Sequence, residues 1–261
     1  MVSLRLECNA DQKDELVAAL WEDGTQGITE VDLNANRVEL RAFFEEEFDA
    51  APYAAYGARW EVEPDIDWAA ETRAAWPGRM VGKRFWIVPP WNEDQTPEGR
   101  VRLVINPGVG FGTGADLTTQ LCLEALEREV RPDDVVFDFG TGSGILALAA
   151  HAINTKKVLA ADIDTDSVLM AKEDLPPEVG LFVGSIRSIR DASIDLLLAN
   201  LNAETITNHA ADMARVLRPG GRVIISGVPP RHGERVVKAL TANGIPPREV
   251  YEQDIWLRIV C

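Results

Sequence analysis

The feature that most constrains the fold is an alternation of short apolar runs with helical patterns from Leu117 to the C-terminus. The apolar runs predict strands at 135–138, 158–162, 181–184, 194–199 and 222–226, with two further strands at the end of the chain. Apolar residues at helical spacing predict helices at 118–128, 144–153, 164–173, 203–217 and 234–242. Buried strands that alternate with amphipathic helices favour a mostly parallel sheet with helices on both faces, so we predict an α/β domain.

The first part of the chain shows a different order of elements. Strand patterns at 2–8, 28–33, 38–44 and 60–62 surround a helical pattern at 11–21 and an acidic, Ala-rich stretch at 45–56 that can supply a second helix. This β-α-β-β-α-β order predicts a small ferredoxin-like α+β domain at residues 1–64. We expect a linker helix at 65–78 and the α/β domain at 79–261, which begins with strand patterns at 85–88 and 101–105.

The charge of the chain is distributed unevenly. The 261 residues include 26 Lys and Arg against 42 Asp and Glu, a formal net charge of −16. Residues 1–66 contain 5 Lys and Arg and 16 Asp and Glu, a net charge of −11. A surface this negative repels nucleic acid and anionic lipid headgroups and attracts cationic partners. We therefore expect no direct nucleic acid binding, and we interpret residues 1–64 as a domain that recognises a basic protein.

Cysteines, histidines and apolar runs give no sign of a metal site or of export. The three cysteines are far apart and contain no C-x-x-C pair, which argues against a disulfide framework and a zinc site. The three histidines lack the spacing of metal ligands. The N-terminus has no basic stretch followed by an apolar run, and no run approaches the ~18 apolar residues of a membrane span. These patterns predict a cytoplasmic protein without a membrane segment, which we expect to be a monomer.

The strongest chemical signal is a glycine-rich turn that follows the strand at 135–138. This strand ends in Asp138, and the chain enters the next helix through Gly140, Gly142 and Gly144. Glycines at such a turn let a ligand approach the backbone beside a helix N-terminus, so Gly140 and Gly142 are candidate cofactor contacts. The dinucleotide fingerprint G-x-G-x-x-G is not met, because Ile145 occupies the sixth position counted from Gly140.

A second acidic residue, Asp162, ends the strand at 158–162, 22 residues after Gly140. In an open α/β sheet this is where a carboxylate accepts both hydroxyls of a ribose. Together with Asp138, which we interpret as a partner for positive charge, it indicates an adenosine that carries a cationic group, as S-adenosylmethionine does. The alternative is that Asp162 and Asp164 only cap the next helix.

Three further segments carry a resemblance to a known family. They are Asn106-Pro-Gly-Val-Gly-Phe-Gly-Thr-Gly-Ala-Asp-Leu-Thr-Thr-Gln-Leu-Cys-Leu, Asp162-Ile-Asp and Ala199-Asn-Leu-Asn-Ala-Glu. With the glycine turn, they make the chain similar to the PrmA family of ribosomal protein methyltransferases over nearly its whole length. The resemblance implies a Rossmann-like class I methyltransferase domain that uses S-adenosylmethionine. It also implies that the chain methylates lysine side chains and an N-terminal amine of a basic ribosomal protein.

The resemblance also assigns roles to individual residues. It implies that Thr119, Gly140, Asp162 and Asn200 contact the cofactor, with Asn200 beside the transferable methyl group. The chain departs from the family pattern at two positions: Asp116 stands where the family has His, and Asn106 where an acidic residue is usual.

Asn200 is the candidate catalytic residue on chemical grounds as well. A sulfonium is an already activated methyl donor, so the protein has only to hold a neutral amine in line with the methyl group. The side-chain carbonyl of Asn200, at the end of the strand at 194–199, can orient the lone pair of such an amine. The departures at Asp116 and Asn106 keep two alternatives open, a lysine methyltransferase for another cytosolic protein and a docking module that binds the cofactor without turnover. A nicotinamide-dependent oxidoreductase is a more distant alternative because the glycine spacing fails at Ile145.

Overall fold

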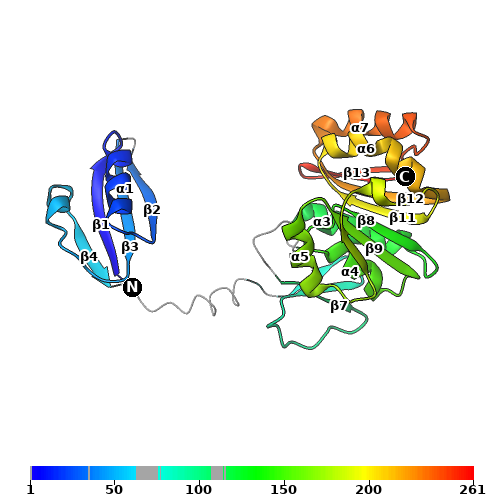
Figure 1. The fold of residues 1–261 in the computed structure, drawn as a ribbon, viewed down its shortest axis with the longest axis horizontal. Helices are drawn as coiled ribbons and strands as arrows, with labels where there is room; N and C mark the ends of the chain where they lie inside the picture. Colours follow the sequence, from blue (N-terminus) through cyan, green and yellow to red (C-terminus); the bar gives the residue numbers. More distant parts are fainter. Residues whose placement is uncertain (1, 35, 63–75, 77, 107–113, 115) are drawn as a thin grey trace. The chain divides into compact units, whose positions relative to one another are not determined.

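The computed structural model describes residues 2–34, 36–62, 76, 78–106, 114 and 116–261 (Figure 1). The chain divides into two compact units, Met1–Thr72 and Arg73–Cys261, which are described separately below. The linker helix expected at 65–78 lies outside the described residues, apart from two isolated positions. Within the described part of the chain, no helix is long and apolar enough to cross a membrane.

The smaller unit is a four-stranded antiparallel sheet with one helix. Its elements are β1 (Val2–Asn9), α1 (Lys13–Glu22), β2 (Gly27–Asn34), β3 (Arg37–Phe44), the 3-10 helix η1 (Ala51–Tyr56) and β4 (Arg59–Val62). The strand order is β2-β3-β1-β4, so that β3 lies between the two strands joined by α1. This split arrangement confirms the predicted ferredoxin-like fold. The second helix is shorter than the stretch at 45–56 suggested, because only its last six residues form a helix.

The core of this unit follows from the alternation in its strands. Leu4 and Leu6 of β1 and Leu40 of β3 point to the same face, where they pack with Leu16 and Leu20 of α1. All five side chains are buried. The opposite face of the sheet therefore carries the charged residues of the same strands.

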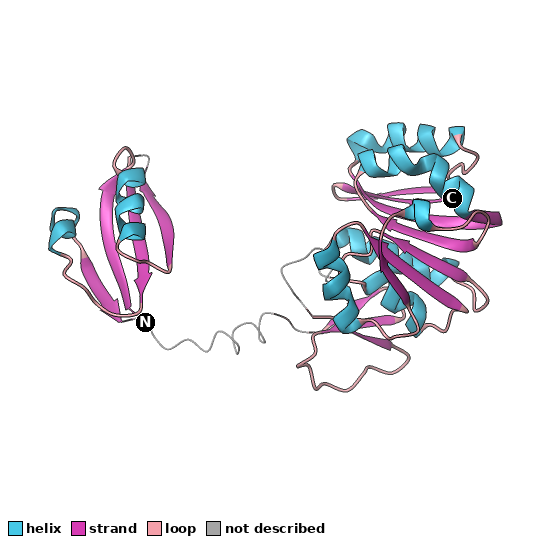
Figure 2. Cartoon of the chain, in the orientation of Figure 1, coloured by secondary structure: helices cyan, strands magenta, loops and turns pink. Residues whose placement is uncertain are grey.

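The larger unit contains a seven-stranded sheet with helices on both faces (Figures 1 and 2). Its elements are α3 (Leu117–Glu129), β8 (Val135–Phe139), α4 (Ile145–Ala152), β9 (Lys157–Asp162), α5 (Thr165–Asp174), β10 (Gly180–Val183), the 3-10 helix η2 (Ile186–Ser188), β11 (Ile194–Asn200), α6 (Ala203–Val216), β12 (Leu217–Val228), α7 (Pro230–Ala242), β13 (Glu249–Gln253) and β14 (Trp256–Val260). The strand order is β10-β9-β8-β11-β12-β14-β13, and β14 alone runs in the direction opposite to the other strands. The predicted mostly parallel sheet is confirmed.

Two hydrophobic clusters show which helices cover each face. Val136 of β8 and Leu198 of β11 pack with α3 and α4 on one face. Phe137 and Leu197, the neighbouring residues, pack with α6 and α7 on the other. Because side chains alternate along a strand, Asp138 and Asn200 must point to the face that α3 and α4 cover.

A three-stranded sheet extends the first of these clusters. It consists of β5 (Arg79–Val81), β6 (Phe85–Val88) and β7 (Val101–Val104), in that order. The carboxylate of Glu127, on α3, accepts hydrogen bonds from the backbone N–H groups of Lys83 and Arg84 at 2.9–3.0 Å. The strands at 85–88 and 101–105 were predicted, whereas β5 has only three residues and was missed.

Candidate active site

The candidate site lies at the carboxyl edge of the large sheet, where the strand order reverses. From β8 the chain continues to β9 and β10 on one side, and it then returns to β11 on the other side of β8. Such a reversal leaves a crevice between the two central strands, which is where open α/β sheets bind ligands. The glycine turn follows β8, Asp162 ends β9 and Asn200 ends β11. Three of the predicted site segments therefore meet at one edge.

The glycine turn adopts a conformation that requires glycine. Gly140, Gly142 and Gly144 all have positive φ values, of 76°, 52° and 85°. The N–H of Gly140 donates to the carbonyl of Ala161 on β9 at 2.9 Å, which anchors the turn to the neighbouring strand. A Cβ atom at Gly140 would lie 2.4 Å from the Leu201 side chain, so only glycine fits between the turn and the end of β11.

Asp138 has an internal role, and our interpretation of it as a partner for a cationic ligand is wrong. Its side chain is fully buried. One carboxylate oxygen accepts hydrogen bonds from the Thr141 hydroxyl at 2.7 Å and from the N–H of Ala147 at 3.2 Å. The residue thus ties the glycine turn to α4. Burial raises the pKa of this carboxyl to about 7, and its hydrogen bonds with Thr141 and Ala147 only partly oppose that shift.

Asp162 joins the glycine turn to the start of α5. One of its carboxylate oxygens accepts the N–H of Gly142 at 3.0 Å, and the other accepts the N–H of Asp164 at 3.1 Å. Asp164 itself is the N-cap of α5, where it accepts the N–H and hydroxyl of Ser167. Asp162 is thus not the capping residue. Each of its oxygens can accept more than one hydrogen bond, so the carboxylate can still accept ribose hydroxyls.

Asn200 and Thr119 come together although they are far apart in the sequence. The Nδ2 group of Asn200 donates to Oγ1 of Thr119 at 3.1 Å. Thr119 is fully buried in the first turn of α3, and its N–H donates to the N-cap residue Asp116 at 2.8 Å. With its amide nitrogen held by Thr119, Asn200 has its carbonyl oxygen available for a substrate amine.

Gly227 also shapes the surroundings of Asn200, and the sequence did not single it out. A Cβ atom at this position would lie 3.1 Å from Oδ1 of Asn200 and 2.7 Å from the Leu201 carbonyl. Its φ of +80° independently favours glycine. The only sequence signal is an isolated glycine near the end of a strand, which does not indicate what the glycine contacts.

The two departures from the family pattern leave this geometry intact. Asp116 caps α3 and accepts the Thr118 hydroxyl at 2.8 Å. The backbone N–H of Asn106 donates to Asp174 of α5 at 2.8 Å, a contact that does not use the Asn106 side chain. The glycine-rich stretch between these residues lies outside the described residues, except for Gly114.

Replacing Thr119 by Val is expected to lower kcat for methyl transfer by about 2–10-fold, the usual effect of one lost neutral hydrogen bond. Valine has nearly the same shape but cannot accept the Asn200 amide hydrogen. Thr119→Ser keeps the hydroxyl and should restore most of the rate. Steady-state kinetics of both variants checks this, and equal rates for Ser and Val would show that the hydrogen bond does not position Asn200.

The residues present fit S-adenosylmethionine. The glycine turn has no room for side chains where Gly140 meets Leu201, and the Asp162 carboxylate stands at the adjoining strand end. Neither the glycine turn nor the end of β9 contains a Lys or Arg side chain, which would repel a sulfonium or attract a pyrophosphate. Among the described residues, no group of three His, Cys, Asp or Glu side chains is placed to hold a metal ion.

Comparison with known proteins gives a consistent result. The family model for ribosomal protein L11 methyltransferase (PrmA) matches residues 53–261. The ribosomal protein L11 methyltransferase of Symbiobacterium thermophilum is 34% identical over 232 residues, which cover 88% of this chain and 76% of that protein. The protein of the same name from Pseudomonas fluorescens is 30% identical over 99% of this chain and 97% of its own length.

A solved structure agrees with the sequence relatives. The crystal structure of a ribosomal protein L11 methylase from Lactobacillus delbrueckii subsp. bulgaricus superimposes with a TM-score of 0.64 and 30% sequence identity. The match covers 69% of this chain and 94% of that chain. The chain therefore belongs to the ribosomal protein L11 methyltransferase (PrmA) family and is an enzyme that uses S-adenosylmethionine.

Proposed function

We propose that this methyltransferase modifies ribosomal protein L11, at lysine side chains, at the N-terminal amine, or at both. The hydrogen bond between Asn200 and Thr119 is the observation that carries the proposal. It fixes an amide carbonyl at the end of β11, next to the strand that leads into the glycine turn. The names of the relatives support L11 as the acceptor. We further propose that the enzyme acts in the cytoplasm as a monomer.

The chemistry asks little of the protein beyond binding and orientation. When bound, S-adenosylmethionine supplies a methyl group already activated on a sulfonium. We propose that Gly140, Gly142, Asp162 and Thr119 bind this cofactor, and that Asn200 contacts both the cofactor and the amine. An amide carbonyl accepts a hydrogen bond from a neutral amine and so directs the nitrogen lone pair. Enclosure of the amine lowers its pKa, because burial disfavours the charged form.

The smaller unit supplies a surface for a basic protein. On the open face of its sheet, Arg5 pairs with Glu61 at 2.9 Å and Arg37 pairs with Glu7 at 2.6 Å, so positive and negative charges balance there. The excess acidic side chains lie elsewhere, in the turn before α1, on the outer side of α1 and in the segments that follow α1 and β3. The exposed ones are Asp11, Glu15, Glu22, Asp23, Glu45, Glu46, Glu47 and Asp49.

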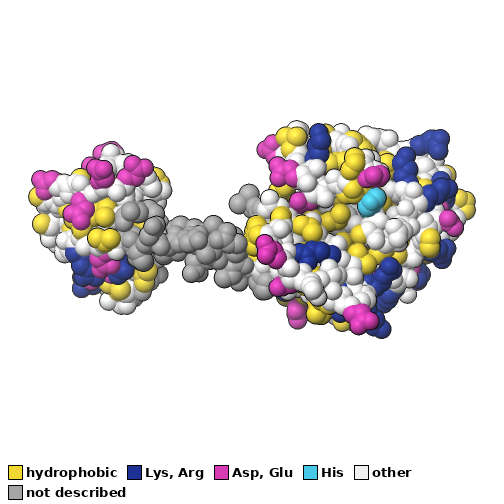
Figure 3. Space-filling model, turned by 90° about the horizontal axis from the view of Figure 1, so that it is seen from below, with side chains coloured by type: hydrophobic (Ala, Val, Ile, Leu, Met, Phe, Trp, Pro, Cys, Tyr) yellow, Lys and Arg dark blue, Asp and Glu magenta, His cyan; other side chains and the backbone are white. Residues whose placement is uncertain are grey.

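Figure 3 shows the same separation of charge. The Lys and Arg side chains of this unit lie in one patch together with some acidic side chains, and further acidic side chains lie away from that patch. We propose that residues 1–64 recognise the acceptor through these acidic side chains rather than through the open sheet face. An acidic surface of this kind steers a basic protein towards the enzyme and weakens as salt is raised.

The experiment is a methyl transfer assay with tritiated S-adenosylmethionine and purified L11, followed by mass spectrometry of the product. We expect label in L11 at amine positions, a KM for L11 that rises with ionic strength, and a cofactor Kd that changes little. Label in another cytosolic protein but not in L11 would favour the alternative lysine methyltransferase. Cofactor binding with no transfer to any ribosomal protein would favour the docking module.

A further inference from the structure

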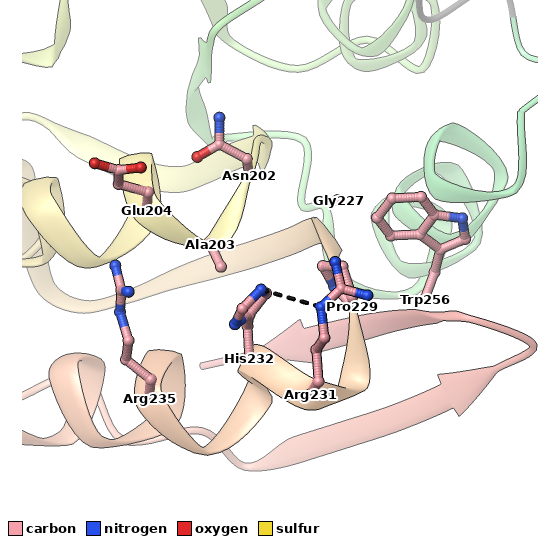
Figure 4. Close-up of a pocket in the computed structure, with 9 residues that line it drawn as sticks. All are labelled: Asn202, Ala203, Glu204, Gly227, Pro229, Arg231, His232, Arg235 and Trp256. Atoms are coloured by element: carbon pink, nitrogen blue, oxygen red, sulfur yellow. Dashed lines mark hydrogen bonds between the residues drawn. The ribbon is translucent and has the colours of Figure 1, made fainter.

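A groove with a volume of about 340 Å³ opens at the carboxyl edge of β12. Its walls come from the first residues of α6, the first two turns of α7 and the start of β14 (Figure 4). In the sheet, β12 lies on one side of β11, whereas β8 and β9, which carry the glycine turn and Asp162, lie on the other. The groove therefore adjoins the candidate active site without overlapping the cofactor residues.

Two residues of the groove, Gly227 and Asn202, lie close to Asn200. Gly227 lines the groove, and a Cβ atom on it would lie 3.1 Å from Oδ1 of Asn200. Asn202 lines it as well, two residues after Asn200. The glycine turn and Asp162 lie on the β8 side of Asn200, whereas the groove lies on its β12 side. A substrate chain that delivers an amine to Asn200 can therefore pass along this groove.

The charges in the groove are mainly positive. Arg231 and Arg235 line it from α7, four residues apart and so on one face of that helix. Of the described residues that line the groove, only Glu204 is acidic. Like charges at this spacing destabilise a helix slightly. Among the residues that the structure describes, neither arginine makes an ion pair, and Arg231 has one hydrogen bond, from Nε to the neighbouring His232 ring at 3.3 Å.

Figure 4 shows the two arginines at different ends of the groove, with His232 between them. The guanidinium of Arg235 extends from α7 towards the side of the groove where Glu204 stands, and Arg231 reaches towards Pro229. The ring of Trp256 lies beyond Arg231 and adds apolar surface. An arginine without a protein carboxylate partner offers a planar set of donors that matches a carboxylate of a ligand.

We propose that this groove binds the stretch of the acceptor protein that flanks the reactive amine, and that Arg231 and Arg235 recognise carboxylate side chains in that stretch. The inference rests on the proposed function, because it assumes a protein acceptor. It adds a means of choosing among many lysines. The acidic smaller unit attracts a basic protein as a whole, whereas the basic groove favours an amine that has an acidic neighbour.

The test is the double variant Arg231→Glu and Arg235→Glu, compared with Lys238→Glu. Lys238 is exposed on the same helix outside the groove, so it reports the effect of charge at that helix alone. We expect the double variant to raise both the KM for L11 and the Kd of L11 measured by calorimetry by about 10-fold or more, as expected for lost hydrogen bonds to charged groups. The cofactor Kd should stay unchanged, and Lys238→Glu should have little effect.

Changes in the acceptor complete the test. Once mass spectrometry has located the methylated amines, the Asp and Glu residues beside each are changed to Asn and Gln. This should raise KM for the wild-type enzyme but not further for the double variant. Wild-type transfer with unchanged KM in the double variant, or an equal rise in Lys238→Glu, would overturn the inference and leave the proposed function standing. Absence of wild-type transfer to L11 would instead refute the proposed function.

Discussion

Replacing Asp162 by Ala is expected to raise the Kd for S-adenosylmethionine by about 100-fold or more. The carboxylate is proposed to accept two ribose hydroxyls, and a hydrogen bond to a charged group contributes about 1.5–3 kcal/mol, where 1.4 kcal/mol is tenfold in Kd. The same change removes the acceptor for the N–H of Gly142, so the glycine turn loses its link to the end of β9. Isothermal titration calorimetry of the purified variant with S-adenosylmethionine measures the effect directly.

Asp164→Ala is the matched control, two residues away. Asp164 caps α5 through the N–H and hydroxyl of Ser167, and losing a cap of this kind destabilises a protein by about 1 kcal/mol. We expect this variant to unfold at lower denaturant concentration but to bind the cofactor with nearly the wild-type Kd. If both variants bound equally well, or if both lost binding to the same extent, Asp162 would have no specific role in holding the ribose.

The fold could be predicted largely because its elements are long and regularly patterned. The central strands of the large sheet are buried on both faces and read as continuous apolar runs, and the helices between them have apolar faces that pack on the sheet. Where an element lacks such a pattern, the sequence did not predict it or predicted it too long. β5 has three residues, of which only Val81 is buried. The second helix of the smaller unit is limited to a 3-10 turn that begins at Ala51 and Pro52.

The site residues at the ends of strands could be predicted from the sequence. The contacts that depend on how distant elements pack together could not. Asp162 and Asn200 close parallel strands, so their common edge follows from topology alone. The pairing of Asn200 with Thr119 depends on where α3 packs, and no local pattern in either segment contains that information. The same holds for Gly227, whose neighbours lie more than 20 residues earlier in the chain.

The role of Asp138 could not be predicted from its charge alone, because the role depends on the face of the strand to which the side chain points. An acidic residue next to a glycine turn indicates a partner for a cation when only its charge is considered. In β8, however, Asp138 lies two residues after Val136 and so points to the same face, which α4 covers, whereas Phe137 points to the opposite face. Thr141, three residues later, then donates to it. An acidic residue inside an apolar strand, followed closely by a threonine, was the signal available in the sequence.

The buried carboxyl of Asp138 should lower the free energy of unfolding as pH rises. Acidic groups whose pKa is lowered by folding have the opposite effect. Its pKa is about 7 in the folded protein against 3.8 for an exposed carboxyl. Below pH 3.8 the group is protonated in both states. Between these values the folded protein keeps a proton that the unfolded chain releases, so the free energy of unfolding falls as pH rises, and the loss is complete above about pH 7.

Asp138→Asn, which cannot ionise but can still accept from Thr141, should therefore gain stability relative to wild type as pH rises from 4 to 8. A pKa unit corresponds to 1.36 kcal/mol, so the relative gain is about 4 kcal/mol at most. Urea unfolding at several pH values measures it. Asp164→Asn is the control, because hydrogen bonds from Ser167 lower the pKa of Asp164 from 3.8, so its contribution is lost only below that pH and its difference from wild type should stay constant between pH 4 and 8. A stability difference between Asp138→Asn and wild type that stays constant across this range would mean that Asp138 remains ionised, which its burial and its unpaired second oxygen oppose.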